Sequence, residues 1–227
     1  MEDMAELQDM HALLMSRVQS VVTACCEYRS SLEQYAYLYV EDRREVLRLF
    51  LLHGHVLTDH ERKMNTPGSI PESPPTLDCF REQVDRYEKL YEEIQALQTV
   101  YVFHGWLRVD SSSMKAALLN TVNKWSSMFK QHLMEHVINS LSELEQFISD
   151  TGQGLEQHVE KGEYSALVGL LSHLLAVKSR QQTTDAMFEP IQQTIALLQD
   201  YGQELPDMVY KHLQVRPMNT RGLLSEQ

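Results

Sequence analysis

The chain has 227 residues, of which 43% are hydrophobic and 23% charged, so a folded core in one or two domains is expected. Its 20 basic and 32 acidic residues give a net charge of 20 − 32 = −12, so nucleic acid is not an expected partner. Three cysteines, two of them adjacent, indicate a reducing compartment without disulfides. The acidic start "MEDMAELQDM" is unlike a secretory signal, and no apolar stretch reaches the roughly 18 residues of a membrane span, so we expect a soluble protein with no membrane partner.

The N-terminal part of the chain has a helical hydrophobic period. Apolar residues recur every three or four positions over residues 4–40 and again over 41–57, which predicts two amphipathic helices. The pair Thr58-Asp59 is either a stop or the cap of a new helix.

A proline-rich segment, "NTPGSIPESPPT" at residues 65–76, interrupts this pattern. Proline lacks the amide donor and restricts the residue before it, so the segment predicts a linker that no helix crosses. Thr76 then caps a helix that runs to about Gln98. The aromatic and β-branched run at 99–110 predicts an extended connector or one short strand.

The C-terminal half is predicted to be long helices. Asp110 or Ser112 caps the longest, at 113–149, and the glycine-containing residues 150–162 predict a loop that can include one turn of helix. Pro190 is expected near the start of a helix, where proline is tolerated. The remaining expected elements are helices at about 163–182 and 184–203 and a short last helix opened by Pro206.

Helix length indicates the architecture. A helix over residues 113–149 is about 55 Å long, whereas a compact globule of this size would be roughly 45 Å across. We therefore expect an all-α fold, an elongated array of long antiparallel helices, with the extended connector near 99–109. The expected divisions are N-terminal helices at 1–64, the linker at 65–76, a helical bundle at 77–213 and a disordered end at 214–227.

One short motif suggests metal chemistry. "KQHLMEHVIN" holds His132, Glu135 and His136 in the H-x-x-E-H order of inverted zincins, in which two histidines one turn apart hold zinc beside a glutamate base. On a helical wheel of about 100° per residue both histidines fall on the apolar stripe, and Glu135 lies about 100° away. A catalytic zinc needs a third protein ligand, and the acids between residues 156 and 163 form no recognisable motif.

We therefore interpret the two histidines as packing residues, partly buried against a neighbouring helix, with a zinc metalloprotease as an alternative. No nucleotide-binding glycine motif occurs, so neither enzymatic activity nor a cofactor is expected. The residues expected at packing or interface positions are Trp106, Trp125, Phe129, His132 and His136.

Long residue runs resemble the tail of axonemal dynein heavy chains, most of all the outer-arm beta type. The resemblance covers about residues 25–213 and implies a helical segment of the N-terminal tail, just before the linker that sweeps over the motor ring. The runs that carry it are "YAYLYVEDRREVLRLFLLHGHVLT" (35–58), "PPTLDCFREQVDRYEKLYEEI" (74–94), "LLNTVNKWSSMFKQHLMEHVINSLSELEQFI" (118–148) and "HLLAVKSRQQTTDAMFEPIQQTIALLQDYGQELP" (173–206).

This resemblance implies a non-catalytic part of a minus-end-directed, ATP-driven microtubule motor of cilia and flagella. Its AAA+ ATP sites and its microtubule-binding stalk have no counterpart in the chain, and the family attaches no zinc chemistry to the H-x-x-E-H stretch. The implied partners are other heavy-chain segments and dynein intermediate and light chains. The implied location is the cytoplasmic cytoskeleton and the axoneme.

The chain departs from the family pattern in two places. "VDSSSMKAALL" (109–119) differs from the usual form at the start of the long helix, and after "ELPDMVYKHL" the chain ends on "QVRPMNTRGLLSEQ" instead of entering the linker. We therefore expect a fragment, a short isoform or a truncated gene product. The alternative is an independent short helical interaction protein derived from a dynein tail.

Overall fold

Helices make up most of the computed structural model, which describes residues 2–64, 71–156 and 164–214. The predicted all-α fold is confirmed, apart from one small two-stranded sheet. In the described part of the chain no helix is both long and apolar enough to cross a membrane. The predictions made for residues 65–70, 157–163 and 215–227 lie outside the described residues.

The chain divides into two compact units, Met1–Phe129 (unit 1) and Lys130–Gln227 (unit 2). The division falls inside the helix α6, Ser112–Leu155, so this one helix supplies side chains to both cores. The domain boundaries expected from the proline-rich segment stay a prediction.

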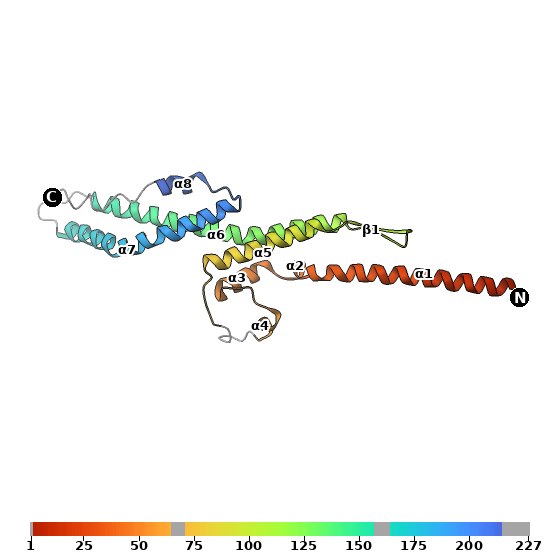
Figure 1. Cartoon of the computed structure of the whole chain (residues 1–227). Helices are drawn as coiled ribbons and strands as arrows, with labels where there is room; N and C mark the ends of the chain where they lie inside the picture. Colours follow the sequence, from red (N-terminus) through yellow and green to blue (C-terminus); the bar gives the residue numbers. More distant parts are fainter. Residues whose placement is uncertain (1, 65–70, 157–163, 215–227) are drawn as a thin grey trace. The chain divides into compact units, whose positions relative to one another are not determined.

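Unit 1 begins with a long helix, but the single helix expected over residues 4–40 is interrupted near its end by a 3₁₀ turn. Figure 1 shows α5 and the first part of α6 side by side. The elements are α1 (Glu2–Leu32), the 3₁₀ turn η1 (Glu33–Tyr35), α2 (Tyr37–Val40), α3 (Arg43–His53), α4 (Asp59–Met64), α5 (Leu77–Ala96), β1 (Val100–Phe103), β2 (Leu107–Asp110) and the start of α6.

Three of these helices begin at a polar cap. The Asp42 carboxylate accepts a hydrogen bond from the Arg44 N–H at the start of α3. Thr58 opens α4, because the Glu61 carboxylate accepts from both its N–H and its hydroxyl, each at 2.8 Å, in a capping box. The Thr76 hydroxyl accepts from a backbone N–H in the first turn of α5, as predicted. Thr58 is therefore the cap of a new helix, which settles the alternative that the sequence left open.

Aromatic rings from three helices fill the core of unit 1. Phe50 of α3 makes edge-to-face contacts with Phe80 of α5 (4.9 Å between centroids) and with Phe129 of α6 (5.1 Å). Tyr87 of α5 stacks on Trp125 of α6 at 5.8 Å. Such geometries add about 0.5–1.5 kcal/mol per pair beyond burial. The aromatic cluster therefore fixes α3, α5 and α6 against one another.

Residues 100–110 form a hairpin, so the extended conformation expected here is confirmed, but it consists of two strands and not one. β1 and β2 pair antiparallel, and the Trp106 N–H donates at 3.3 Å to the carbonyl of the last residue of β1. The two central turn residues, His104 and Gly105, have φ of 49° and 79°. Positive φ at both positions is the mark of a type I′ turn, whose twist matches that of antiparallel strands.

Unit 2 contains the rest of α6, then α7 (Tyr164–Asp200) and α8 (Asp207–Gln214). Helix α6 continues to Leu155, so the loop expected from residue 150 is wrong over its first part. At Gly154 a Cβ atom would overlap the imidazole ring of His173 on α7, so this glycine leaves room for that side chain within the helix and does not mark a turn.

The two helices expected around Pro190 are one, because α7 runs through this proline. Proline removes one hydrogen bond to the carbonyl four residues earlier, that of Ala186. Both residues are exposed, so water can serve the released carbonyl, and the Thr194 hydroxyl donates to the Pro190 carbonyl at 2.8 Å. The prediction that Pro190 lies near a helix start is therefore wrong, whereas α8 does begin just after Pro206 as expected.

Candidate functional surfaces

The side chains of the H-x-x-E-H motif differ in burial. His132 is half-buried, and burial, then the neighbouring His136, lowers the pKa of its imidazole below the usual 6.5. His136 is exposed, so the prediction that it is partly buried is wrong. The Glu135 carboxylate is also exposed and accepts a hydrogen bond from the Gln131 amide at 2.9 Å.

The helical wheel wrongly predicts that His136 is partly buried, because α6 buries a different side in unit 2. In the first part of α6 the buried stripe includes Leu118 and Val122, and both histidines share its direction. In unit 2 the directions of the buried apolar residues of α6 average about 95° from Leu118 on the same wheel. His136, which points in the direction of Leu118, therefore lies outside the stripe that α6 buries in unit 2. These buried residues are Leu133, Val137, Leu141 and Leu144.

Among the described residues, no group of three or more histidine, cysteine, aspartate or glutamate side chains could hold a metal ion. Glu156 is exposed at the end of α6, and the other acids considered as third ligands, Glu160 and Glu163, lie outside the described residues. A catalytic zinc requires three protein ligands. The described part of the chain therefore gives the zinc hypothesis no third ligand.

The three other candidate residues differ sharply in environment. Trp125 and Phe129 are completely buried in the aromatic cluster of unit 1. Trp106 is 57% exposed at the hairpin turn, so it does not anchor that core. An interface role for Trp106 stays a prediction.

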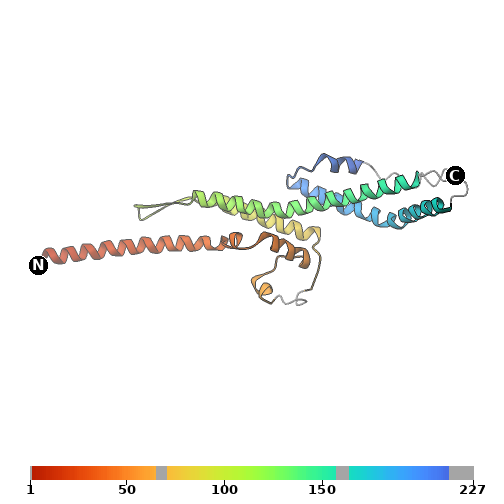
Figure 2. The same ribbon diagram turned by 180° about the vertical axis from the view of Figure 1, so that it is seen from behind.

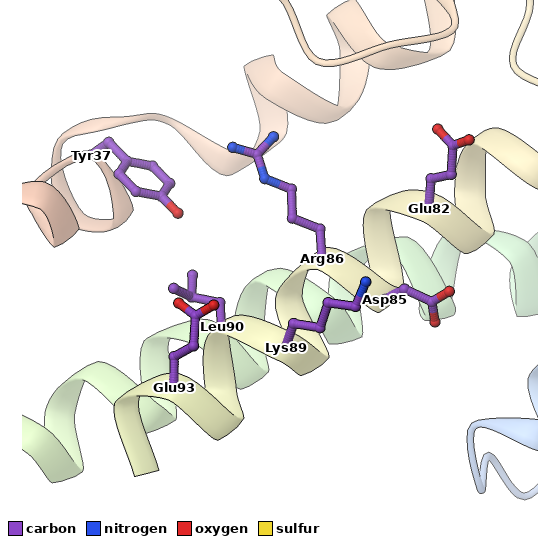
Figure 3. Close-up of a pocket in the computed structure, with 7 residues that line it drawn as sticks. All are labelled: Tyr37, Glu82, Asp85, Arg86, Lys89, Leu90 and Glu93. Carbon is purple, nitrogen blue, oxygen red and sulfur yellow. The ribbon is translucent and has the colours of Figure 1, made fainter. Parts of the chain in front are cut away.

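A surface hollow of about 440 Å³ lies between α2 and α5 in unit 1. Figure 3 shows Tyr37 of α2 facing a row of α5 side chains. The pKa of the Tyr37 phenol is raised, chiefly by burial. The row carries charges of both signs along one helix, with no paired nucleophile and base, which is typical of a solvated helix face. The α5 residues are Glu82, Asp85, Arg86, Lys89, Leu90 and Glu93.

Exposed apolar side chains are concentrated on two helices. Several of those on α1 recur along one side of the helix, and those on α7 occupy its first turns. Monomeric soluble proteins rarely expose long apolar stripes, and such stripes mark sites of interaction. The exposed residues are Met4, Leu7, Met10, Leu13, Leu14, Met15, Val18 and Val22 on α1, and Tyr164, Leu167, Val168, Leu171, Leu174 and Leu175 on α7. The apolar residues that recur every three or four positions in the sequence predict the α1 stripe, but spacing alone does not show whether another part of the structure covers it.

No family model matches the chain. Individual proteins match it closely over 96% of its length. The chain is 53% identical to "Dynein beta chain, ciliary" of Tripneustes gratilla and 49% identical to "Dynein axonemal heavy chain 9" of Homo sapiens. It is 25% identical, over 88% of its length, to "Dynein beta chain, flagellar outer arm" of Chlamydomonas reinhardtii.

The chain spans about 5% of the length of these relatives, so the comparison concerns one short stretch of a very long protein. Within that stretch the match is continuous over 217 residues. The chain therefore belongs to the axonemal dynein heavy chains.

Proposed function

We propose that the chain is a non-catalytic segment of the tail of an axonemal dynein heavy chain, placed just before the linker. The observation that carries this proposal is the match to several axonemal heavy chains at 42–53% identity over 96% of the chain. The whole protein would be a minus-end-directed, ATP-driven microtubule motor. It would act in the axoneme of cilia or flagella.

The long helices support a role as a mechanical spacer. At about 1.5 Å per residue, the 44 residues of α6 extend over about 66 Å and the 37 residues of α7 over about 55 Å. A helix transmits force along its axis only if side chains hold it in place. Helix α6 has such anchors in both units, with Trp125 and Phe129 in unit 1 and Val137 in unit 2, all completely buried.

The chemistry of the described surfaces supports a non-catalytic role. The sequence lacks the G-x-x-x-x-G-K-[ST] loop that cradles ATP phosphates. The hollow between α2 and α5 is lined by a mixed-charge helix face. We therefore expect no ATP hydrolysis by the purified chain, and the ATPase activity of the whole motor would reside outside this segment.

The exposed apolar stripes support an assembly role. Side chains such as Leu7 on α1 and Leu171 on α7 are largely solvent-exposed in the chain by itself. In the tail they would pack against other segments of the heavy chain. Dynein intermediate and light chains are further proposed partners.

An antibody raised against this chain tests the proposal on isolated axonemes. A band at the size of a whole heavy chain supports the tail assignment. A band only near 26.3 kDa, the mass of the chain, would overturn it in favour of an independent short interaction protein.

A further inference from the structure

Helix α1 carries a heptad pattern of mostly apolar residues along one side. Its apolar positions alternate in steps of three and four residues, the 3.5-residue period of helices that pack lengthwise on other helices. Only one polar residue, His11, interrupts the pattern. The seam consists of Met4, Leu7, His11, Leu14, Val18, Val21, Cys25, Tyr28 and Leu32, and Tyr35 of the following turn continues it.

The C-terminal half of this seam is already an interface within unit 1. Val21 is only 2% exposed, and the Tyr28 ring packs on Tyr101 of β1 at 4.4 Å between centroids. The Tyr28 hydroxyl donates to the Ser111 hydroxyl at 2.7 Å. At the hairpin turn, Ser20 and His104 share a hydrogen bond of 3.1 Å. The hairpin therefore covers the seam back to about residue 20.

The N-terminal half of the same seam is uncovered in the described structure. Met4 and Leu7 are 69% and 68% exposed, and Leu14 and Val18 are exposed as well. In Figures 1 and 2 this part of α1 extends beyond the hairpin, with no other element of unit 1 beside it. The exposed seam is thus the direct continuation of an interface that the fold already uses.

We infer that the seam over Met4–Val18 is the docking surface for one amphipathic α-helix from outside this chain. A helix fits because the alternating steps of three and four residues accept the a and d side chains of another helix. The acidic residues Glu6 and Asp9 lie about 120° and 180° from the centre of the seam on a helical wheel, so the apolar positions, and not charge, define this partner. This inference does not depend on the dynein tail assignment.

A membrane surface is a poorer occupant. Helices that lie on lipid carry lysine and arginine on the polar face, which anionic headgroups attract. Glu6 and Asp9 are exposed on α1, and Arg17 is the first basic residue along the helix. This surface charge would repel an anionic bilayer.

A second copy of the chain is also a poorer occupant. The uncovered seam over Met4–Val18 is about two heptads long, whereas a stable coiled-coil dimer needs about three to four. A helix that is already held folded in a larger partner loses less conformational entropy on docking than a free one does, so a seam of about two heptads is long enough for it.

Two neighbouring leucines allow a matched test on the full chain. Leu13 and Leu14 are both 60% exposed, but they point about 100° apart, and only Leu14 is on the seam. Glutamate forms helix well, so Leu14→Glu and Leu13→Glu should both fold, which circular dichroism checks. The probe is a fluorescent peptide of about three heptads with leucine at its seam and both lysine and glutamate at its other positions, held helical by side-chain cross-links.

Fluorescence anisotropy should show that Leu14→Glu weakens peptide binding by about tenfold or more, while Leu13→Glu binds like the unchanged chain. A cross-linked peptide of the same composition whose leucines do not form a seam should bind less tightly. Equal binding by the two variants would overturn the docking surface, and equal binding of the two peptides would overturn the amphipathic helix as its partner.

Two further outcomes would assign the seam to another occupant and overturn the inference. One is a dimer of the unchanged chain, seen by light scattering, that Leu14→Glu dissociates. The other is sedimentation with vesicles of anionic phospholipid that the same substitution abolishes. The expected results are a monomer and no sedimentation.

Discussion

Replacing Trp125 by phenylalanine tests how unit 1 is held together. Trp125 is completely buried, stacks on Tyr87, and donates its indole N–H to the Leu38 carbonyl of α2 at 3.1 Å. Trp125→Phe keeps an aromatic ring in the core but removes this donor and part of the side-chain volume. The substitution therefore separates the specific contribution of the indole from that of a generic aromatic side chain.

The expected loss has two parts. The smaller ring leaves about 40 Å³ empty, which at about 24 cal/mol per Å³ costs about 1 kcal/mol. The buried Leu38 carbonyl loses the indole donor, at a cost of about 1–3 kcal/mol. Trp125→Phe should therefore lower the free energy of unfolding of unit 1 by about 2–4 kcal/mol.

Urea unfolding followed by circular dichroism measures this loss, and the chain provides its own control. Trp106→Phe makes the same change at a side chain that is 57% exposed and should alter stability by no more than about 0.5 kcal/mol. Because the chain has two tryptophans, each variant keeps one. Tryptophan emission should be at shorter wavelength in Trp106→Phe, which retains the buried ring. Equal stability of the two variants would refute the reasoning.

The other predictions concern single residues. The backbone N–H and hydroxyl of Thr58 hold the pKa of the Glu61 carboxyl at about 2, below its usual 4.5. The ionised carboxylate therefore stabilises α4 above pH 4.5, and this stabilisation is lost as pH falls towards 2. Glu61→Gln should abolish this pH dependence, and an NMR titration that places the Glu61 pKa near 4.5 would contradict it. Burial lowers the pKa of His132 below 6.5, so the unfolded chain binds this proton at a higher pH than the folded chain, and stability falls as pH drops through 6.5. Between pH 7 and pH 5, His132→Gln should lose less free energy of unfolding, measured in urea, than the unchanged chain. An equal loss would count against this. Gly152→Ala meets no neighbouring atom and should stabilise α6 by about 0.5–1 kcal/mol. Gly154→Ala should stabilise α6 less, because its methyl group must displace the His173 imidazole. Thermal melting compares the two variants, and equal shifts would contradict this contact.

Helix starts could be predicted from the sequence because their causes are local. Thr58 and Thr76 cap helices through hydrogen bonds to residues three positions later, and those residues are visible in the sequence. The start of α8 just after Pro206 has an equally local cause.

The hairpin was missed although part of its signal was present. Gly105 readily adopts positive φ, but its turn partner His104 is a non-glycine residue with φ of 49°, which is uncommon. The sequence therefore lacked the Asn-Gly or Asp-Gly pair that usually marks a two-residue turn. The packing of Tyr28 on β1, which fixes the hairpin on α1, joins residues too far apart in sequence for a local pattern to reveal.

The burial of the candidate packing residues could be predicted only in the part of α6 where the stripe around Leu118 is the side that packs against other helices. The wheel around Leu118 placed Trp125 and Phe129 on a stripe that is indeed buried. The same wheel also placed His136 on this stripe, but in unit 2 α6 buries a different side and His136 is exposed. Periodicity gives the faces of a helix, but the tertiary contacts decide which face is covered.

The aromatic cluster of unit 1 also has a consequence for synthesis on the ribosome. Phe50 contacts Phe129, which is 129 − 50 = 79 residues later in the chain. At about 5–20 residues per second, Phe129 is made about 4–16 s after Phe50. During that interval the apolar face of α3 has no α6 to cover it. Newly made chains should therefore depend on chaperones until α6 has left the ribosome.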